Sequence, residues 1–329
     1  MQAHFASNQG FQFNTDAPLV AMGENRIQKL KINANTASSA IRFKTEIEQF
    51  AAGSSMIIYN TSVNANIADN KINFLVNLHD ANDKNKYRFG GLFAQPGKGG
   101  YTLKLNPDWL LLNYDKWDMT ADNLLRLNKG DINVHNFAIS RKGQQLRINS
   151  TAETANSPLD VILSQFRIGT ITGFAKQDTA LIDGVINGKA TIQNIATQPS
   201  LTSHLSITDL MFRQDTVGNL NIKVENPNAQ QFAANITLTG KGNDVAITGN
   251  YNVKPANQST YTMVLDMRKL QVASIQAFSM GSITGGAGYL KGRFDVSGTF
   301  EKPDINGKVN FQDAEFTPVM LGSHFTIDN

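Results

Sequence analysis

The second half of the chain repeats one pattern of residues at a spacing of 104 positions. Shifting the sequence by this distance aligns Gly184 with Gly288 and Pro199 with Pro303, without a gap between them. Self-similarity at a fixed period is typical of repeat proteins, in which each unit covers the apolar face of its neighbour. The repeat therefore favours one continuous surface over a single catalytic pocket. The other identical pairs are Ile171/Ile275, Phe174/Phe278, Gly188/Gly292, Asp209/Asp313, Phe212/Phe316 and Gly218/Gly322.

Apolar and polar residues alternate through most of the chain, and this alternation predicts strands. The segments 72–78 and 87–93 alternate across a polar turn, so we expect them to pair as a hairpin. Two further hairpins are predicted, one joining 137–139 to 146–148 and one joining 236–238 to 245–247. Strand after strand, one face is apolar and the other polar. Two outcomes are open: a closed sandwich core, or an open curved sheet with an apolar trough.

Two stretches depart from the alternation and lie at equivalent positions of the repeat. Residues 166–174 and 270–278 carry apolar side chains at mixed spacings of three and four. Each is interpreted as a short helix or a bent crossing between two parts of a sheet. The glycine-rich segment 281–292 is expected to bend sharply. Between residues 24 and 60 the pattern is weaker, and 45–50 can also form a short helical turn.

Composition and length exclude several classes of function. The net charge is +3, and Lys and Arg are scattered without a basic run, which argues against nucleic acid as a partner. The absence of cysteine excludes disulfides and thiolate chemistry. No apolar stretch reaches the ~18 residues that a membrane-spanning helix needs.

The domain organisation expected from these patterns follows the repeat. Residues 1–100 form an N-terminal β segment, 101–226 a first repeat unit and 227–329 a second. Both ends of the chain lie in strand-like patterns, so we expect a segment of a larger protein.

No constellation of reactive residues is evident, and we expect neither catalysis nor a metal or cofactor. The five histidines lie far apart without ligand-like spacing, and Asp115, Asp118 and Asp122 lack the spacing of a calcium loop. A carbohydrate-active enzyme on a β scaffold would need clustered carboxylates, which the sequence does not place together. The repeated pair Asp209/Asp313 is interpreted as turn-forming carboxylates at strand ends.

Glycine runs and tryptophans have structural explanations as well. The runs 97–100 and 285–288 lack the complete fingerprint of a phosphate-binding loop and are interpreted as turns or close sheet bends. Trp109 and Trp117 are interpreted as core packing, with ligand stacking as the alternative.

The repeated residues carry a resemblance to a known family. The run from Gly288 to Asp313 resembles the TamB-type translocation and assembly module family of the AsmA-like group, in a form similar to Bacteroidota members. Members repeat the unit G-x-x-x-G-x-x-x-V-x-G-x-x-x-x-P-x-hydrophobic-x-G-x-hydrophobic, and the copy from Gly184 to Asp209 keeps its two opening glycines and its proline. That copy departs from the unit at Asn194 and Ser203, where the second copy has Gly298 and Gly307.

The resemblance implies a β-taco, which is a long curved antiparallel sheet with an apolar concave face and few short helices. It implies a segment of a periplasmic conduit that moves phospholipid between the inner and outer membranes. Its partners would be phospholipid acyl chains and, for the full-length protein, an Omp85-type outer-membrane assembly protein; the full-length protein would be anchored in the inner membrane. The alternative is an assembly module that templates strands of outer-membrane β-barrel proteins.

A lipid-binding trough needs apolar side chains and no specific ligating residue, because burial of an acyl chain stabilises by ~0.8 kcal/mol per methylene. The predicted lining consists of Ile186, Ala190, Ile192, Leu205, Ile207, Ile236, Leu238, Val245, Ile247, Met263, Leu265, Leu290, Phe294, Val296, Val309 and Phe311.

Overall fold

The protein is all-β, as its alternation predicts. The structure is a computed structural model that describes residues 2–6, 10–53, 56–97, 99–173, 181–195, 199–213, 215–228, 230–255 and 258–327. Strands make up 73% and helices 5% of it, in two large antiparallel sheets that do not close. The described residues form two compact units. Unit 1 comprises Met1–Leu159 and Gly169–Ala180, and unit 2 comprises Asp160–Ile168 and Leu181–Asn329. The divisions expected after residues 100 and 226 stay predictions.

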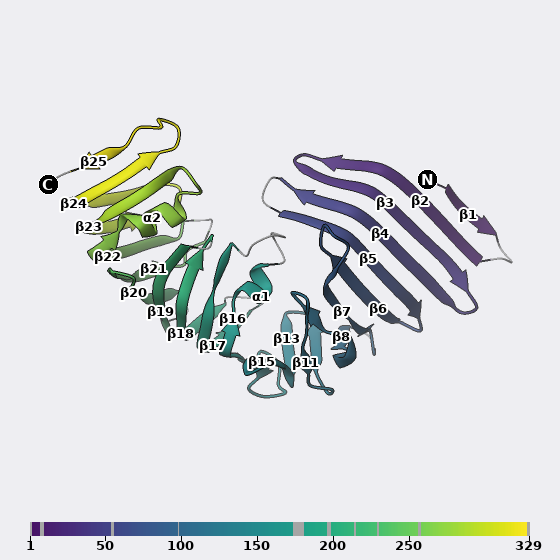
Figure 1. Ribbon diagram of the computed structural model, residues 1–329. Coiled ribbons are helices and arrows are strands. Elements are labelled where there is room, and N and C mark those ends of the chain that lie inside the picture. Colours follow the sequence, from purple (N-terminus) through teal and green to yellow (C-terminus); the bar gives the residue numbers. More distant parts are fainter. Residues whose placement is uncertain are drawn as a thin grey trace. The chain divides into compact units, whose positions relative to one another are not determined.

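Most of the main sheet of unit 1 is a meander, in which strands that follow one another in the chain lie side by side (Figure 1). Its strands, in spatial order, are β1 (Gln2–Ala6), β2 (Gly10–Met22), β3 (Asn25–Ala37), β4 (Ala40–Ala52), β5 (Met56–Ala68), β6 (Lys71–His79), β7 (Asn85–Ala94), β8 (Gly100–Leu105), β12 (Leu124–Asn128) and β13 (Asp131–His135).

Shorter elements complete unit 1. The strands β9 (Leu111–Leu112) and β10 (Asp115–Lys116) pair with each other, and β9 also pairs with β7. The strands β11 (Asp118–Met119), β14 (Phe137–Arg141) and β15 (Gln144–Ser150) pair in that order. Two short helices are the 3-10 helix η1 (Pro107–Trp109) and the helix α1 (Gly169–Thr172).

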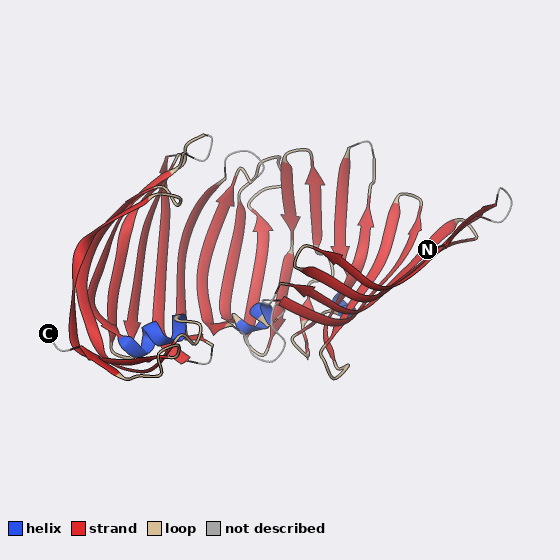
Figure 2. Cartoon of the chain, turned by 90° about the horizontal axis from the view of Figure 1, so that it is seen from above, coloured by secondary structure: helices blue, strands red, loops and turns tan. Residues whose placement is uncertain are grey.

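Unit 2 is a second antiparallel meander, curved across its strands, and it carries one helix (Figure 2). The helix α2 (Val272–Phe278) lies on the concave side near one end of the strands (Figures 1 and 2). The strands, again in spatial order, are β16 (Leu159–Arg167), β17 (Ile182–Gln193), β18 (Ser200–Phe212), β19 (Asp215–Asn228), β20 (Gln231–Gly240), β21 (Asn243–Asn252), β22 (Thr260–Gln271), β23 (Ile283–Gly298), β24 (Pro303–Pro318) and β25 (Phe325–Ile327).

All three predicted hairpins are confirmed, each between the predicted segments. In the first, Phe74 lies opposite Gly91 and Val76 opposite Phe89. In the hairpins β14–β15 and β20–β21 the paired residues are likewise the predicted ones. Their two-fold alternation places partners on one face, which strongly specifies the register.

The helical turn expected at 45–50 is wrong, because these residues belong to β4. Their backbone pairs on both sides, so that Thr45 lies opposite Ile32 of β3 and Val63 of β5. Pairing with two neighbours satisfies the backbone groups of this segment and outweighs its local helical propensity.

Short helices do occur at both interruptions of the alternation, as predicted. The helix α1 falls within 166–173 and α2 within 270–278, at equivalent positions of the repeat. Phe174, the last residue of the first predicted stretch, lies outside the described residues.

The repeated aspartates lie inside long strands, so the expectation that they end strands is wrong. Asp209 in β18 and Asp313 in β24 both adopt the left-handed conformation, with φ of 49° and 47°. The register shifts beside each of them, which marks a β-bulge. Because one residue is added, Leu210 points to the same face as Ile207, three positions earlier, instead of the opposite face. Asp tolerates this conformation better than β-branched or bulky residues do.

Two adjacent residues of β7 hold α1 in position through hydrogen bonds. The ammonium of Lys86, which is 4% exposed, donates a hydrogen bond of 2.8 Å to the carbonyl of Gly173. The hydroxyl of Tyr87, also 4% exposed, donates to the carbonyl of Thr170 at 3.2 Å. Carbonyls at the C-terminal end of a helix have no intrahelical partner, so a cation and a hydroxyl stabilise them there.

The buried phenol of Tyr87 predicts a loss of stability at high pH. Burial, together with the nearby Tyr114, raises the pKa of Tyr87 from 10.0 to about 12. The folded state therefore holds this proton more tightly than the unfolded state. We expect its stabilisation to be complete below pH 10 and to be lost as the pH rises to about 12, by roughly 2–3 kcal/mol in total. Urea unfolding between pH 9 and 12 would measure the loss. The loss should be much smaller in Tyr87→Phe and should persist in the control Tyr101→Phe, whose ring is exposed; equal curves for Tyr87→Phe and the unmodified protein would contradict the assignment.

Candidate functional site

The register of unit 2 aligns apolar residues in rows that cross eight strands, from β17 to β24. In antiparallel sheets, residues directly opposite each other lie on the same face. Three adjacent rows therefore form one surface, which we call the apolar face. The rows are Ile186–Ile207–Leu220–Leu238–Val245–Met267–Gly292–Val309, Gly188–Leu205–Ile222–Ile236–Ile247–Leu265–Phe294–Gly307 and Ala190–Ser203–Val224–Ala234–Gly249–Met263–Val296–Ile305.

The structure brings all sixteen predicted lining residues to this face. Thirteen belong to the three rows. Of the others, Leu290 lies opposite Phe311, and Ile192 continues the alternation of β17 beyond Ala190. The predicted residues come from seven strands, β17, β18 and β20–β24, and they lie on a single surface.

One strand of the face is missing from the predicted lining. Leu220, Ile222 and Val224 of β19 lie in the middle of the three rows. Their signal in the sequence is plain, because they alternate with Asn221 and Lys223. Without β19 the predicted residues of β18 and β20 would not be contiguous.

The apolar face is partly open to solvent. Of the sixteen predicted residues, Ile207 and Val245 are buried, at 8% and 7% exposure, and the remaining fourteen are half-buried. A closed sandwich would bury such a row of aliphatic side chains on a second layer. An exposed apolar surface of this continuity is typical of a site that binds an apolar partner.

The helix α2 covers one end of the apolar face. Ala277 of α2 forms a buried cluster with Phe212 and Val217, and Leu238 of the first row packs against it. Val217 is fully buried and Ala277 is 2% exposed. Apolar burial therefore fixes α2 on this side of the sheet.

A buried amide holds the start of α2 in place. Asn243 donates hydrogen bonds from Nδ2 to the carbonyl of Val217 and to Oγ of Ser274, both at 2.7 Å. Its Oδ1 accepts from the backbone N–H of Gln271 at 2.8 Å. These bonds satisfy all but one of the bonding positions of a side chain that is only 5% exposed. The role of Asn243 cannot be predicted from the sequence, because only the folded sheet brings its partners together.

Charged side chains of unit 2 lie on the opposite, polar face and pair there. Lys189 contacts Asp160 at 2.8 Å, and Arg268 contacts Asp244 at 2.7 Å. Burial acts to raise the pKa of Asp160, but hydrogen bonds from Lys189 and Thr191 outweigh it and lower this pKa. None of the residues in the three rows is ionisable. The two faces therefore differ completely in charge.

Several of the candidate histidines and aspartates form ion pairs near the surface. In the described parts of the chain, no group of three His, Asp or Glu side chains is arranged to hold a metal ion. His79 contacts Asp83 at 2.7 Å on the surface, and His135 lies between Asp122 and Glu153 at 3.7 and 3.4 Å. Asp115 pairs with Arg141. The side chain of His4 and residue 98 of the glycine run 97–100 lie outside the described residues.

Comparison with known proteins identifies no family for this chain. No family model, no curated protein sequence and no solved structure matches the chain significantly. In the described residues, the helices are too short and too polar to form a membrane span.

Proposed function

We propose that the apolar face of unit 2 binds phospholipid acyl chains and that the chain is a segment of a conduit for phospholipid between two membranes. The observation that supports this is the continuity of the three rows across eight strands, with the side chains half-buried and uncharged. An acyl chain needs only contiguous apolar area, because its methylenes carry no group to be recognised.

The open side of the apolar face suits the remaining part of a phospholipid. While the tails contact the apolar face, the charged headgroup stays in water, where its solvation costs nothing. A lipid can then pass along the rows from one strand to the next with little change in free energy, since neighbouring strands present the same apolar chemistry on this face. By the resemblance described above, we propose that such a conduit lies in the periplasm and that the full-length protein has an Omp85-type partner.

Substitution of a central residue of the face tests lipid binding. The ring of Phe294 lies over Gly307, where an added Cβ would be 2.6 Å from it, so Phe294 is a fixed part of the surface. Phe294→Glu should reduce the uptake of fluorescent phospholipid by delipidated protein about tenfold or more, because a buried Phe contact stabilises by roughly 1.5–3 kcal/mol. Ile192→Glu should act in the same direction. Native mass spectrometry and photo-crosslinking would identify the bound lipid.

The matched control for this experiment is the neighbouring residue. Arg293 lies one position away on the exposed polar face, so Arg293→Glu adds the same carboxylate without touching the apolar face. Its uptake should equal that of the unmodified protein. Absence of lipid from the unmodified protein, or equal losses in both variants, would rule out the proposal.

A second candidate function is strand addition to a client β-barrel protein. In the described part of the chain, β25 pairs only with Ala314–Phe316 of β24, which leaves the outer edge of 303–313 without a partner strand. An unpaired edge can template another strand. Crosslinking of an unfolded barrel protein to this edge, unchanged by Phe294→Glu, would favour it over lipid binding.

A further inference from the structure

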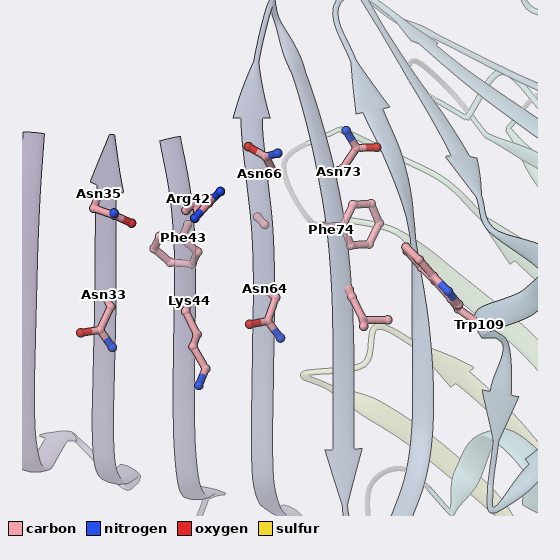
Figure 3. Close-up of a pocket in the computed structure, with 12 residues that line it drawn as sticks. Asn33, Asn35, Arg42, Phe43, Lys44, Asn64, Asn66, Asn73, Phe74 and Trp109 are labelled. Carbon is pink, nitrogen blue, oxygen red and sulfur yellow. The ribbon is translucent and has the colours of Figure 1, made fainter. Parts of the chain in front are cut away.

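A hollow of about 550 Å³ lies on the sheet of unit 1, and none of the residues that line it belongs to the proposed lipid site. It crosses the strands β3 to β6, and Trp109 stands at one end (Figure 3). The register places Asn35, Arg42, Asn66 and Asn73 in one row across these strands. Since strands lie ~4.8 Å apart, the distance from β3 to β7 is roughly 20 Å. The hollow is therefore long enough to hold a short oligomer of several monomers.

Five of the twelve residues that line this hollow are asparagines. Asn33, Asn35, Asn64, Asn66 and Asn73 are all exposed, and none of them makes a side-chain hydrogen bond within the described parts of the chain. Each carboxamide offers two N–H donors and a carbonyl acceptor. A sugar hydroxyl is likewise both donor and acceptor, so a row of free carboxamides matches a polyhydroxylated ligand.

Trp109 supplies a flat apolar surface beside these amides. An added Cβ on Gly90 would lie 2.7 Å from Cε3 of Trp109, so the indole packs directly on the backbone of β7. The carbonyl of Trp109 accepts from Nε of Arg88 at 3.3 Å, and its N–H donates to the carbonyl of Asn106 at 3.2 Å. The residue is therefore held in position while its side chain remains half-exposed. An aromatic ring of this kind packs on the C–H face of a pyranose and leaves the hydroxyls free to bond.

The charge of the hollow favours an acidic ligand. Its lining contains Arg42 and Lys44 but no Asp or Glu. Lys44 is paired with Glu46 at 2.8 Å, whereas Arg42 has no acidic partner in the described part of the chain. A guanidinium binds a carboxylate through two parallel hydrogen bonds.

We propose that this hollow is a binding site for an acidic oligosaccharide. A sugar ring packs on Trp109, the hydroxyls of neighbouring rings bond the asparagine carboxamides, and a carboxylate of the glycan pairs with Arg42. The site lies on β3–β6 of unit 1 and shares no residue with the apolar face of unit 2. It is therefore independent of lipid binding.

Binding of defined tetrasaccharides to the full chain tests the site. We expect tetragalacturonate to bind in isothermal titration calorimetry, with maltotetraose binding more weakly. Trp117 is 1% exposed, so a change in tryptophan fluorescence on binding reports on Trp109. Iodide quenching of this fluorescence should fall when the sugar covers the indole.

Substitutions test separately what the aromatic ring, the carboxamides and the guanidinium contribute to binding. Trp109→Ala should weaken tetragalacturonate binding about tenfold, and Trp109→Phe, which keeps a ring over Gly90, should weaken it less. The double substitution Asn64→Ala and Asn66→Ala should weaken it about fivefold. Arg42→Gln should remove the preference for tetragalacturonate over maltotetraose.

Matched control residues lie on strands, outside the hollow. Tyr101→Ala removes an exposed aromatic ring, Asn235→Ala an exposed carboxamide and Arg26→Gln an exposed guanidinium, and none of these residues lines the hollow. All three should bind as the unmodified protein does. The proposal is overturned if neither tetrasaccharide binds at millimolar concentration, or if the controls lose as much affinity as the hollow variants. It is also overturned if a ten-residue thymidine oligonucleotide binds more tightly than tetragalacturonate in a Trp109-dependent manner, which would assign the hollow to single-stranded nucleic acid.

Discussion

Val217→Asp is expected to detach α2 from the apolar face and to destabilise unit 2 by at least about 3 kcal/mol. Val217 has no exposed surface and packs against Phe212 and Ala277, so the new carboxylate would have neither water nor a cationic partner. Hydrogen exchange of the α2 amides should accelerate strongly, because the helix has seven residues and depends on tertiary packing for its stability.

The control for this prediction is the preceding residue. Thr216 is exposed on the same strand, so Thr216→Asp introduces the same charge beside the buried position. We expect its urea midpoint and the exchange of 272–278 to remain within error of the unmodified protein. Equal exchange rates in α2 for both variants would show that the cluster does not hold the helix.

Gly188→Ala is expected to be the most damaging single methyl addition in β17. A Cβ at this position would lie 2.1 Å from the carbonyl oxygen of His204 and 2.9 Å from Cα of Leu205, both in the backbone of β18. The φ of 131° is also one that residues with a side chain rarely adopt. Because the neighbouring backbone must move, we expect a loss of about 2–4 kcal/mol in the free energy of unfolding.

Gly281→Ala separates the clash from the backbone conformation. Gly281 also has a positive φ, of 84°, but an added Cβ there would meet no atom within 4 Å. The control should therefore lose only the conformational part, about 1 kcal/mol. Thermal unfolding followed by circular dichroism would compare the two. If both variants melted together, close strand approach would not be the reason that glycine occupies position 188.

Much of the fold follows from alternation alone. The pairing of Phe74 with Gly91 and of Ile236 with Ile247 could be predicted, because a two-residue period and a short polar turn together leave one register. The bulge at Asp209 could not be predicted from the sequence. A single extra residue in a strand leaves the apolar spacing ambiguous until the partner strand shows which side chains share a face.

The candidate site was predictable in part for the same reason. Alternation places Leu265 and Phe294 on apolar faces of their own strands, and the structure aligns them opposite each other. Contacts across large sequence separations carry no such signal. The bonds of Lys86 to Gly173 and of Asn243 to Ser274 join residues that only the folded sheet brings together.

The polar hollow of unit 1 was missed because its residues are ordinary when taken singly. Exposed asparagines in strands usually face water, and Trp109 was interpreted as core packing. Only the register shows Asn35, Asn66 and Asn73 in one row with Arg42 between them.

The chain-order meander of unit 2 makes its length adjustable. Each strand from β16 to β25 pairs only with its neighbours in the chain. Duplication of one hairpin would therefore add two strands, or roughly 10 Å of sheet, without altering any existing pair. Because two strands restore the original direction, the rows would continue in phase across the insertion. A surface built in this way can evolve to a required length by duplication of its own hairpins. Each new hairpin pairs locally, so its folding does not depend on contacts with distant parts of the chain.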